Sequence, residues 1–344
     1  MMKNKFSGNY YEIGFQLGTQ IKDFFQLPPA SEETKTFAEK CRPLVRKHAP
    51  GIIDELQGLC DAAGFDSRLL DAFVLALGRD QINEARELFK HGIDFGCTSF
   101  AISSTQTGIK TAIFAQNYDW TESFREFFTM LWNDPEEGIP NLSFTDHIVG
   151  RYGGMNKAGL AMSIHGVPSY QKEWTPGLRM NVIARWVLDN FKTTKETVHY
   201  IENIPYVCGH NFLICDDRDV IARIESAGDE VIVTYSENGF MGITNQYDTK
   251  SLKKYEFQNF SFRNSEVRLN KVNKWFEDNK SRIDLDKIKK LLSGHNSGVC
   301  NHFEFGGETT STIWSWIAKI NTDEILVCDG SPCNNPYEIF NINF

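Results

Sequence analysis

The chain has 344 residues, 41% hydrophobic and 24% charged, which is the composition of a soluble globular protein with a large core. Its net charge of −9, with no basic stripe, argues against general nucleic-acid binding, because phosphate contacts need clustered lysine and arginine. The most apolar window, Leu69–Leu77, contains Asp71 and is about half as long as the ~20 residues of a membrane span, and the first residues form no apolar leader. We therefore expect a cytoplasmic protein that binds neither nucleic acid nor membrane.

The N-terminal part is predicted to be mainly helical up to about residue 90. Apolar residues recur at helical spacing, and Pro50-Gly51 separates two of the segments. Gly14 and Gly18, four residues apart, predict close packing of the first helix against a neighbour. Four helices are predicted, over residues 9–27, 33–48, 51–63 and 67–89.

From residue 97 onward the patterns favour strands, interrupted by two pairs of helices. Gly-containing turns predict two hairpins, one over 98–116 and one over 147–165. The remaining predicted strands cover residues 211–215, 220–226, 230–235, 239–245, 312–320 and 324–328, and the helices cover 178–191, 194–203, 263–278 and 284–293.

This order of elements predicts an α+β protein. It lacks the strict alternation of strand and helix that a parallel sheet requires, and hairpins imply antiparallel sheets. Two sheets between helical layers would satisfy the pattern. No repeat or flexible linker divides the chain, so we expect a single domain over 1–344.

The eight cysteines are scattered through the chain, which favours free thiols over a disulfide framework. Cys208-Gly-His210 and Cys300-Asn-His302 bring thiol and imidazole groups together, but no CxxC or HxxxH spacing supports a zinc site. Buried cysteines and loop histidines are the simpler interpretation. We expect no metal and no cofactor.

Cys97 is the residue with the strongest claim to chemistry, although a buried structural cysteine is the simpler interpretation of its residue type alone. A cysteine nucleophile needs a nearby base or positive charge. A His-assisted site of the papain kind would place the cysteine on a helix, whereas residues 98–102 are strand-like. If the Gly96–Cys97 bond is cut, the freed α-amine, with a reference pKa near ~8, serves as base. Gly96 suits this cleavage, because it lets the thiol approach the preceding carbonyl.

Several short motifs follow one another along the chain. They occupy residues 6–18, 96–99, 116–120, 153–160, 244–246, 299–302 and 330–332. In this order they resemble the isopenicillin-N acyltransferase-like (acyl-CoA:6-aminopenicillanic acid acyltransferase) branch of the N-terminal-nucleophile hydrolases, which is related to choloylglycine hydrolases and penicillin V acylases. The resemblance covers nearly the whole chain. It implies a four-layer αββα sandwich of two antiparallel sheets.

The resemblance also implies roles for three residues. Cys97 would be the nucleophile, and Asp119 the carboxylate that holds its freed amine and orients the thiol. Asn245 would be the side-chain donor of the oxyanion hole, worth roughly 3–4 kcal/mol. Without the resemblance, Asp119 and Asn245 would be interpreted as turn residues. Autocatalytic cleavage at Gly96–Cys97 would convert a zymogen into a helical segment, 1–96, and a catalytic segment, 97–344.

Further residues around these three are candidates for lining the site. Gln116 stands where bile-salt hydrolases carry arginine, so bile-salt hydrolysis is not implied. Asn117 orders the site or caps its strand. Met155 and Asn156 belong to a hairpin turn that borders the pocket in relatives, and His165 is structural or pocket-lining rather than catalytic.

The last motif region departs from the family. Residues 308–314 contain no arginine for the late catalytic position. Among the hydroxyl groups in and next to this segment, we select those of Thr310, Ser311 and Ser315 as candidates for lining the site. The indole rings nearby suit a pocket for an apolar acyl or aryl group, although such rings more often belong to the core. They belong to Trp120, Trp314 and Trp316.

The resemblance implies a hydrolase or acyltransferase that attacks a linear, non-peptide amide and forms a Cys97 thioester. Its partners would be a small-molecule amide or acyl donor and, after cleavage, its own two segments. The resemblance leaves homo-oligomers open. Two competing hypotheses are a His-assisted cysteine peptidase without self-cleavage and a non-catalytic binding protein on the same scaffold.

Overall fold

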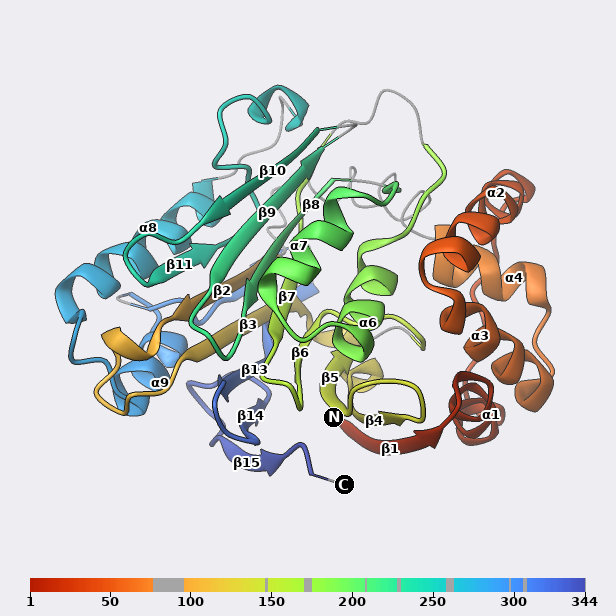
Figure 1. Cartoon of the computed structure of the whole chain (residues 1–344), viewed down its shortest axis with the longest axis horizontal. Helices are drawn as coiled ribbons and strands as arrows, with labels where there is room; N and C mark the ends of the chain where they lie inside the picture. Colours follow the sequence, from red (N-terminus) through yellow and green to blue (C-terminus); the bar gives the residue numbers. More distant parts are fainter. Residues whose placement is uncertain are drawn as a thin grey trace.

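Two β-sheets lie face to face at the centre of the protein, with helices on both outer faces (Figure 1). The computed structural model describes residues 1–76, 96–145, 148–169, 175–207, 209–227, 230–257, 263–296, 298–305 and 308–343. Among these residues, no helix is long and apolar enough to cross a membrane.

The N-terminal segment contains the predicted helices, but it begins with a strand that was not predicted. The elements are β1 (Met2–Gly8), α1 (Tyr10–Ile21), α2 (Glu32–His48), α3 (Pro50–Ala63) and α4 (Ser67–Asp71), which continues as a π-helical turn, Ala72–Ala76. Asn9 and Glu12 form a capping box that fixes the start of α1. The predicted close packing of α1 is confirmed, because a Cβ on Gly14 would lie 1.9 Å from the carbonyl oxygen of Glu55 in α3. The rest of the predicted fourth helix lies outside the described residues.

The first sheet has eight strands in the order β1-β4-β5-β6-β7-β8-β9-β10. Its strands after β1 are β4 (Thr129–Pro135), β5 (Asn141–Thr145), β6 (Gly153–Asn156), β7 (Ala161–Gly166), β8 (His210–Cys215), β9 (Ile221–Ala227) and β10 (Glu230–Tyr235). All neighbours pair antiparallel except β1, which pairs with β4 in parallel over its whole length. The segment before residue 96 thus contributes an edge strand to the main body.

The second sheet has seven strands in the order β11-β2-β3-β13-β14-β15, with β12 paired to β13. Its strands are β2 (Gly96–Ile102), β3 (Ile113–Thr121), β11 (Phe240–Ile243), β12 (His302–Phe305), β13 (Glu308–Lys319), β14 (Glu324–Asp329) and β15 (Glu338–Asn341). The predicted hairpin after Cys97 is confirmed as β2 and β3, joined through a 3-10 turn, Ser104–Gln106.

Aromatic rings fill the space between the sheets. The indole ring of Trp314 stacks 4.7 Å from Phe144 of the other sheet and 5.0 Å from Tyr118 of its own. Trp314 and Trp316 are fully buried in this core, which agrees with the interpretation that such rings more often belong to the core than to a pocket.

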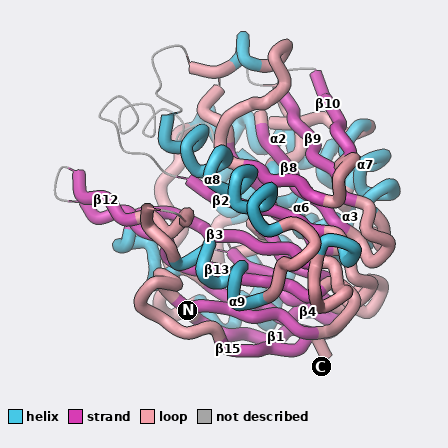
Figure 2. Tube along the Cα trace, turned by 90° about the vertical axis from the view of Figure 1, so that its left-hand side faces the viewer, coloured by secondary structure: helices cyan, strands magenta, loops and turns pink. Residues whose placement is uncertain are grey.

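Helices complete the two outer layers. Helices α8 (Arg263–Asn279) and α9 (Leu285–Ser293) cover β2, β3 and β13, as Figure 2 shows. Helices α6 (Met180–Asn190) and α7 (Thr194–Glu202) cover the first sheet, and α1–α4 lie outside α6. The predicted four-layer αββα architecture is confirmed.

Candidate active site

Cys97 is the second residue of β2, the first strand after the N-terminal helices. It is 7% exposed and lies directly opposite Tyr118 of β3, so it belongs to the core between the sheets. Its backbone N–H donates to the Oδ1 atom of Asn245 at 2.8 Å, and its carbonyl accepts from the guanidinium of Arg268 at 2.6 Å. Both peptide groups of this residue are therefore held by side chains.

Gly96, the preceding residue, has no room for a side chain. A Cβ built on it would lie 2.2 Å from Nη2 of Arg268 and 3.0 Å from Oδ1 of Asn245. Contacts of real Cβ atoms are essentially never shorter than 3.0 Å. A glycine here therefore permits the guanidinium and the amide to lie against the Gly96–Cys97 peptide.

Arg268, in α8, is the main site residue that the sequence analysis missed. Arg268 is 3% exposed. Its guanidinium donates to the Cys97 carbonyl, to Thr98 Oγ1 at 2.9 Å and to Asn245 Oδ1 at 3.3 Å. The one feature of the sequence that could have identified Arg268 is its position within the helical pattern. Along α8 the buried residues Ser265, Arg268, Leu269, Val272 and Phe276 follow the helical period, so Arg268 occupies the buried stripe of the helix.

Asn245 follows β11 and is held at three points. Its Oδ1 accepts from the Cys97 N–H, its Nδ2 donates to the Gly166 carbonyl at 3.0 Å, and its backbone N–H donates to Ser265 Oγ at 2.8 Å. The structure therefore brings the side chain of Asn245 to the backbone of Cys97. Its Nδ2 group lies at the end of β7, beside the same peptide.

Asp119 is fully buried in β3, directly opposite Gly96 on one side and Thr312 of β13 on the other. Thr312 Oγ1 donates to Asp119 Oδ1 at 2.6 Å. The register of β13 shifts between Thr312 and Trp314, which places Thr312 at this position. The hydroxyl beside the carboxylate is thus that of Thr312, which the sequence analysis did not select.

His165 is the histidine of β7 that lies near Cys97, and it is fully buried. Its Nε2 atom hydrogen bonds with Ser99 Oγ at 2.8 Å. Burial, reinforced by the positive charge of Arg268, lowers the pKa of His165 to about 3. The imidazole is therefore neutral and a poor acceptor for a thiol proton at neutral pH.

Gln116 and Asn117 have structural contacts. Gln116 Oε1 accepts from the indole N–H of Trp316 at 2.8 Å, within the core. Asn117 Nδ2 donates to the carbonyl groups of Leu292 at 2.9 Å and Val299 at 3.2 Å, so it anchors the end of α9 and the segment that follows. Of the two roles considered for Asn117, the contacts favour ordering the surroundings of the site.

The other residues proposed to line the site lie apart from the Cys97 contacts. Asn156 bonds to four backbone groups of its own turn and of α6, which favours the turn role, and Met155 is buried in β6 beside it. In β13, Ser311 Oγ donates to Glu122, Ser315 Oγ donates to the Gln116 carbonyl, and Thr310 lies opposite Thr121.

One group of side chains could hold a metal ion within the described part of the chain. Cys300 and His302 lie together with His295 and Cys333, outside the contacts of Cys97. The sequence analysis considered Cys300 and His302 and expected no metal, because no CxxC or HxxxH spacing supports a zinc site there.

Residues 106–334, 229 of the 344, match the family model for acyl-coenzyme A:6-aminopenicillanic acid acyl-transferase. The matched segment contains Asp119, Asn245 and Arg268, and it begins after Cys97. No curated protein matches the chain.

Solved structures that are similar to this chain include a variant of the conjugated bile acid hydrolase from Clostridium perfringens. Its TM-score is 0.51 at 15% identity, over 71% of this chain and 92% of that one. Penicillin V acylase from Agrobacterium tumefaciens gives 0.46 at 16% identity, over 68% of this chain and 83% of that one. The first similarity, together with the two facing sheets, confirms the predicted N-terminal-nucleophile hydrolase fold.

Proposed function

The chain belongs to the acyl-coenzyme A:6-aminopenicillanic acid acyl-transferase family, and on this basis we propose that it is an amide hydrolase or acyltransferase with Cys97 as nucleophile. The observation that carries the proposal is the double anchoring of Cys97. Its N–H is bound by Asn245 and its carbonyl by Arg268, two buried side chains from elements far away in sequence. A merely structural cysteine at the start of a strand needs neither contact.

Maturation would begin with attack of Cys97 Sγ on the carbonyl carbon of Gly96. The C–N bond breaks, the acyl group moves to sulfur as a thioester, and the nitrogen becomes a free amine. Water then hydrolyses the thioester, which leaves a carboxylate on Gly96 and restores the thiol. The guanidinium of Arg268 adjoins this peptide, and a nearby positive charge favours a thiolate.

In the mature enzyme, the thiolate would attack the carbonyl of a small-molecule linear amide. The freed α-amine of Cys97 would accept the thiol proton and return it to the leaving amine. Asp119 would hold this amine, and Asn245 Nδ2 would donate to the oxyanion. Water or another amine would release the acyl group from sulfur. The low pKa of His165 supports the amine, rather than a histidine, as base.

The two segments would stay associated after cleavage. Strand β1 pairs with β4, and the buried Arg185 of α6 forms an ion pair with Glu55 of α3 at 3.1 Å. Arg179, before α6, donates to the carbonyl groups of Phe73 and Val74. These contacts tie the segment before residue 96 to the main body at several independent places.

The intact mass of the purified chain tests this proposal. Cleavage predicts fragments of 96 and 248 residues, because residues 97–344 remain together, and Cys97→Ala should stay one chain. Cys60→Ala, which removes a half-buried free thiol in α3, is the matched control and should cleave normally.

A thiol-directed acylating probe separates the alternatives. The proposal predicts labelling of Cys97 in the 248-residue fragment. A His-assisted peptidase would remain one chain and would lose activity in His165→Ala, and a binding protein would be neither cut nor labelled. An uncut wild-type chain with an unreactive Cys97 contradicts the proposal.

A further inference from the structure

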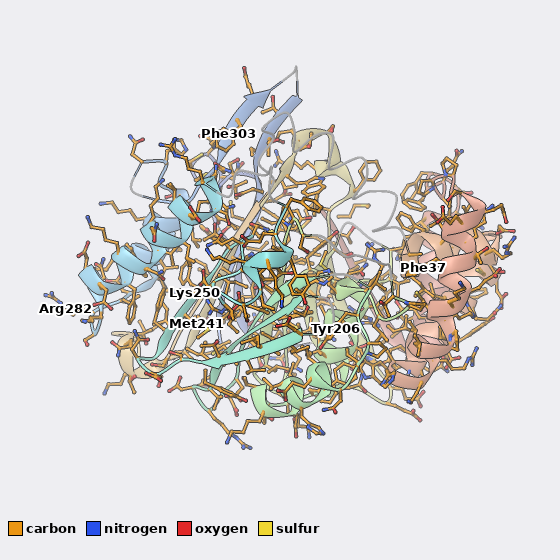
Figure 3. The ribbon with its side chains drawn as sticks, turned by 90° about the horizontal axis from the view of Figure 1, so that it is seen from above. Phe37, Tyr206, Met241, Lys250, Arg282 and Phe303 are labelled. Atoms are coloured by element: carbon orange, nitrogen blue, oxygen red, sulfur yellow. The ribbon has the colours of Figure 1, made fainter. Side chains whose placement is uncertain are left out.

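Two thiols and two imidazoles meet at the edge of the second sheet. His295 follows α9, Cys300 precedes β12, His302 begins β12, and Cys333 lies in the turn between β14 and β15. One ligand atom from each of these four side chains lies within 4.8 Å of all the others. Figure 3 labels Phe303, the neighbour of His302, on the hairpin that projects from the body here.

The distances agree with a shared tetrahedral ion. Zn–S bonds of ~2.3 Å and Zn–N bonds of ~2.05 Å at tetrahedral angles place sulfur and nitrogen about 3.6 Å apart. His302 Nε2 lies 3.6 Å from Cys300 Sγ and 3.2 Å from Cys333 Sγ. The rings of His295 and His302 meet edge to face at 5.1 Å, so both imidazoles approach the same centre.

From this arrangement we propose that His295, Cys300, His302 and Cys333 bind one zinc ion. Two sulfur and two nitrogen ligands select zinc over magnesium or calcium, which need oxygen ligands. With four protein ligands the coordination is closed, so the ion is structural. Binding removes a proton from each of the two thiols, and the ion joins their thiolates to two neutral imidazoles.

The main chain around the ligands is already fixed by β13. Thr312 N–H donates to the Asn301 carbonyl at 3.0 Å, and the Asn301 N–H donates to Thr312 Oγ1 at 3.0 Å. Ser331 Oγ donates to the Thr312 carbonyl at 2.7 Å and so holds the turn that carries Cys333. Both ligand-bearing segments are thus bound to Thr312, which places three of the ligands before the ion arrives.

The same residue links the zinc site to the candidate active site. Thr312 Oγ1 donates to Asp119, and Asn117 in the same strand bonds to the Val299 carbonyl, beside Cys300. A zinc ion would therefore stiffen the segment that supports Asp119. This consequence depends on the proposed function, whereas the metal site does not.

Metal content of the full, untagged chain tests the site. We expect about one zinc per chain by elemental analysis after dialysis under reducing conditions, because the site has four protein ligands. Cobalt added to the chelated, reduced chain should give visible tetrahedral bands and a thiolate-to-cobalt charge-transfer band. Cys333→Ser should lose the zinc and the charge-transfer band, and His302→Ala provides a second variant. Cys60→Ser, which alters a half-buried thiol in α3, should behave as wild type.

Two results would overturn the proposal. One is a folded, reduced wild-type chain that keeps no zinc and gives no charge-transfer band with cobalt. The other is a chain lighter by two hydrogens, with Cys300 and Cys333 joined in a disulfide, that takes up no metal once reduced. Retention of zinc with an inactive Cys97 would instead contradict the proposed function alone.

Discussion

Replacing Gly96 with alanine should slow maturation without changing the mature enzyme. The new Cβ would lie 2.2 Å from Nη2 of Arg268, so the guanidinium must move to at least 3.0 Å. That movement strains its contacts with the Cys97 carbonyl and with Asn245. Losing one charged hydrogen bond costs about 1.5–3 kcal/mol, which corresponds to about ten- to a hundredfold in rate if the contact acts in the transition state.

The assay is the time course of the two fragments by mass spectrometry. Gly166→Ala is the matched control, because a Cβ on Gly166 meets nothing within 4 Å although its carbonyl accepts from Asn245. Activity per cleaved molecule should equal that of wild type, since residue 96 does not belong to the catalytic segment. Cleavage of Gly96→Ala at the wild-type rate would refute the reasoning.

A double-mutant cycle tests whether Arg268 carries the effect. In an Arg268→Met background the guanidinium is gone, so Gly96→Ala should slow maturation much less than it does alone. Fully additive effects of the two substitutions would show that Gly96→Ala acts through another contact.

Three further predictions concern buried polar groups. Thr312→Val should lower both the free energy of unfolding, by about 1–3 kcal/mol, and activity, because Asp119 loses a buried donor; urea unfolding and an amidase assay measure these. The pKa of His165 is lower in the folded chain than in the unfolded chain, so the unfolded chain binds the proton first as the pH falls, and the free energy of unfolding decreases. His165→Gln should remove about 2 kcal/mol of this decrease between pH 7 and 5. Glu55→Gln breaks a buried ion pair with Arg185 and should destabilise the chain by about 3–5 kcal/mol, seen as a lower melting temperature.

Each of these predictions has a matched control. Thr310→Val changes a buried threonine of the same strand and should leave activity unchanged. His199→Gln, which alters an exposed histidine of α7, is the control variant for the same pH series. Glu277→Gln removes an exposed ion pair of α8 and should change stability by less than about 1 kcal/mol. A control that behaves like its test variant would contradict the corresponding prediction.

Hairpins and amphipathic helices could be predicted because each produces a pattern of apolar residues within a short stretch of sequence. The hairpin of β2 and β3 has a turn between two alternating runs, and α2 and α3 have clear helical periods separated by Pro50. Strand β1 was missed because Phe6 is its one buried residue, so its stability comes from parallel pairing with β4. Pairing of that kind joins residues more than a hundred positions apart and leaves no local signal.

Some residues of the candidate site could be predicted from the sequence, and others could not. Motif order brought Cys97, Asp119 and Asn245 together, although none of them stands out by residue type. Arg268 was missed because an arginine in an amphipathic helix is usually exposed, and only its place in the buried stripe distinguishes it. The ligand set of the proposed zinc site was missed because the turn between β14 and β15 brings Cys333 close to Cys300 only in the folded chain. Short metal-binding motifs detect ligands that are close together in sequence.

From the register of β2 and β3 we propose that Asp119 acts on the freed amine of Cys97 and does not contact the thiol directly. Cys97 lies opposite Tyr118, toward the core between the sheets, whereas Asp119 lies opposite Gly96, whose side-chain direction points at Arg268 of α8. Cleavage would remove Gly96 from this place and turn the Cys97 nitrogen into an amino group that can rotate. Before cleavage that nitrogen donates to Asn245, and Asp119 lies opposite the residue that precedes it, so we propose that the freed amine turns toward the Asp119 carboxylate. Cleavage would then give the buried carboxylate a positively charged neighbour on the freed chain end, which would couple the electrostatics of the site to its maturation.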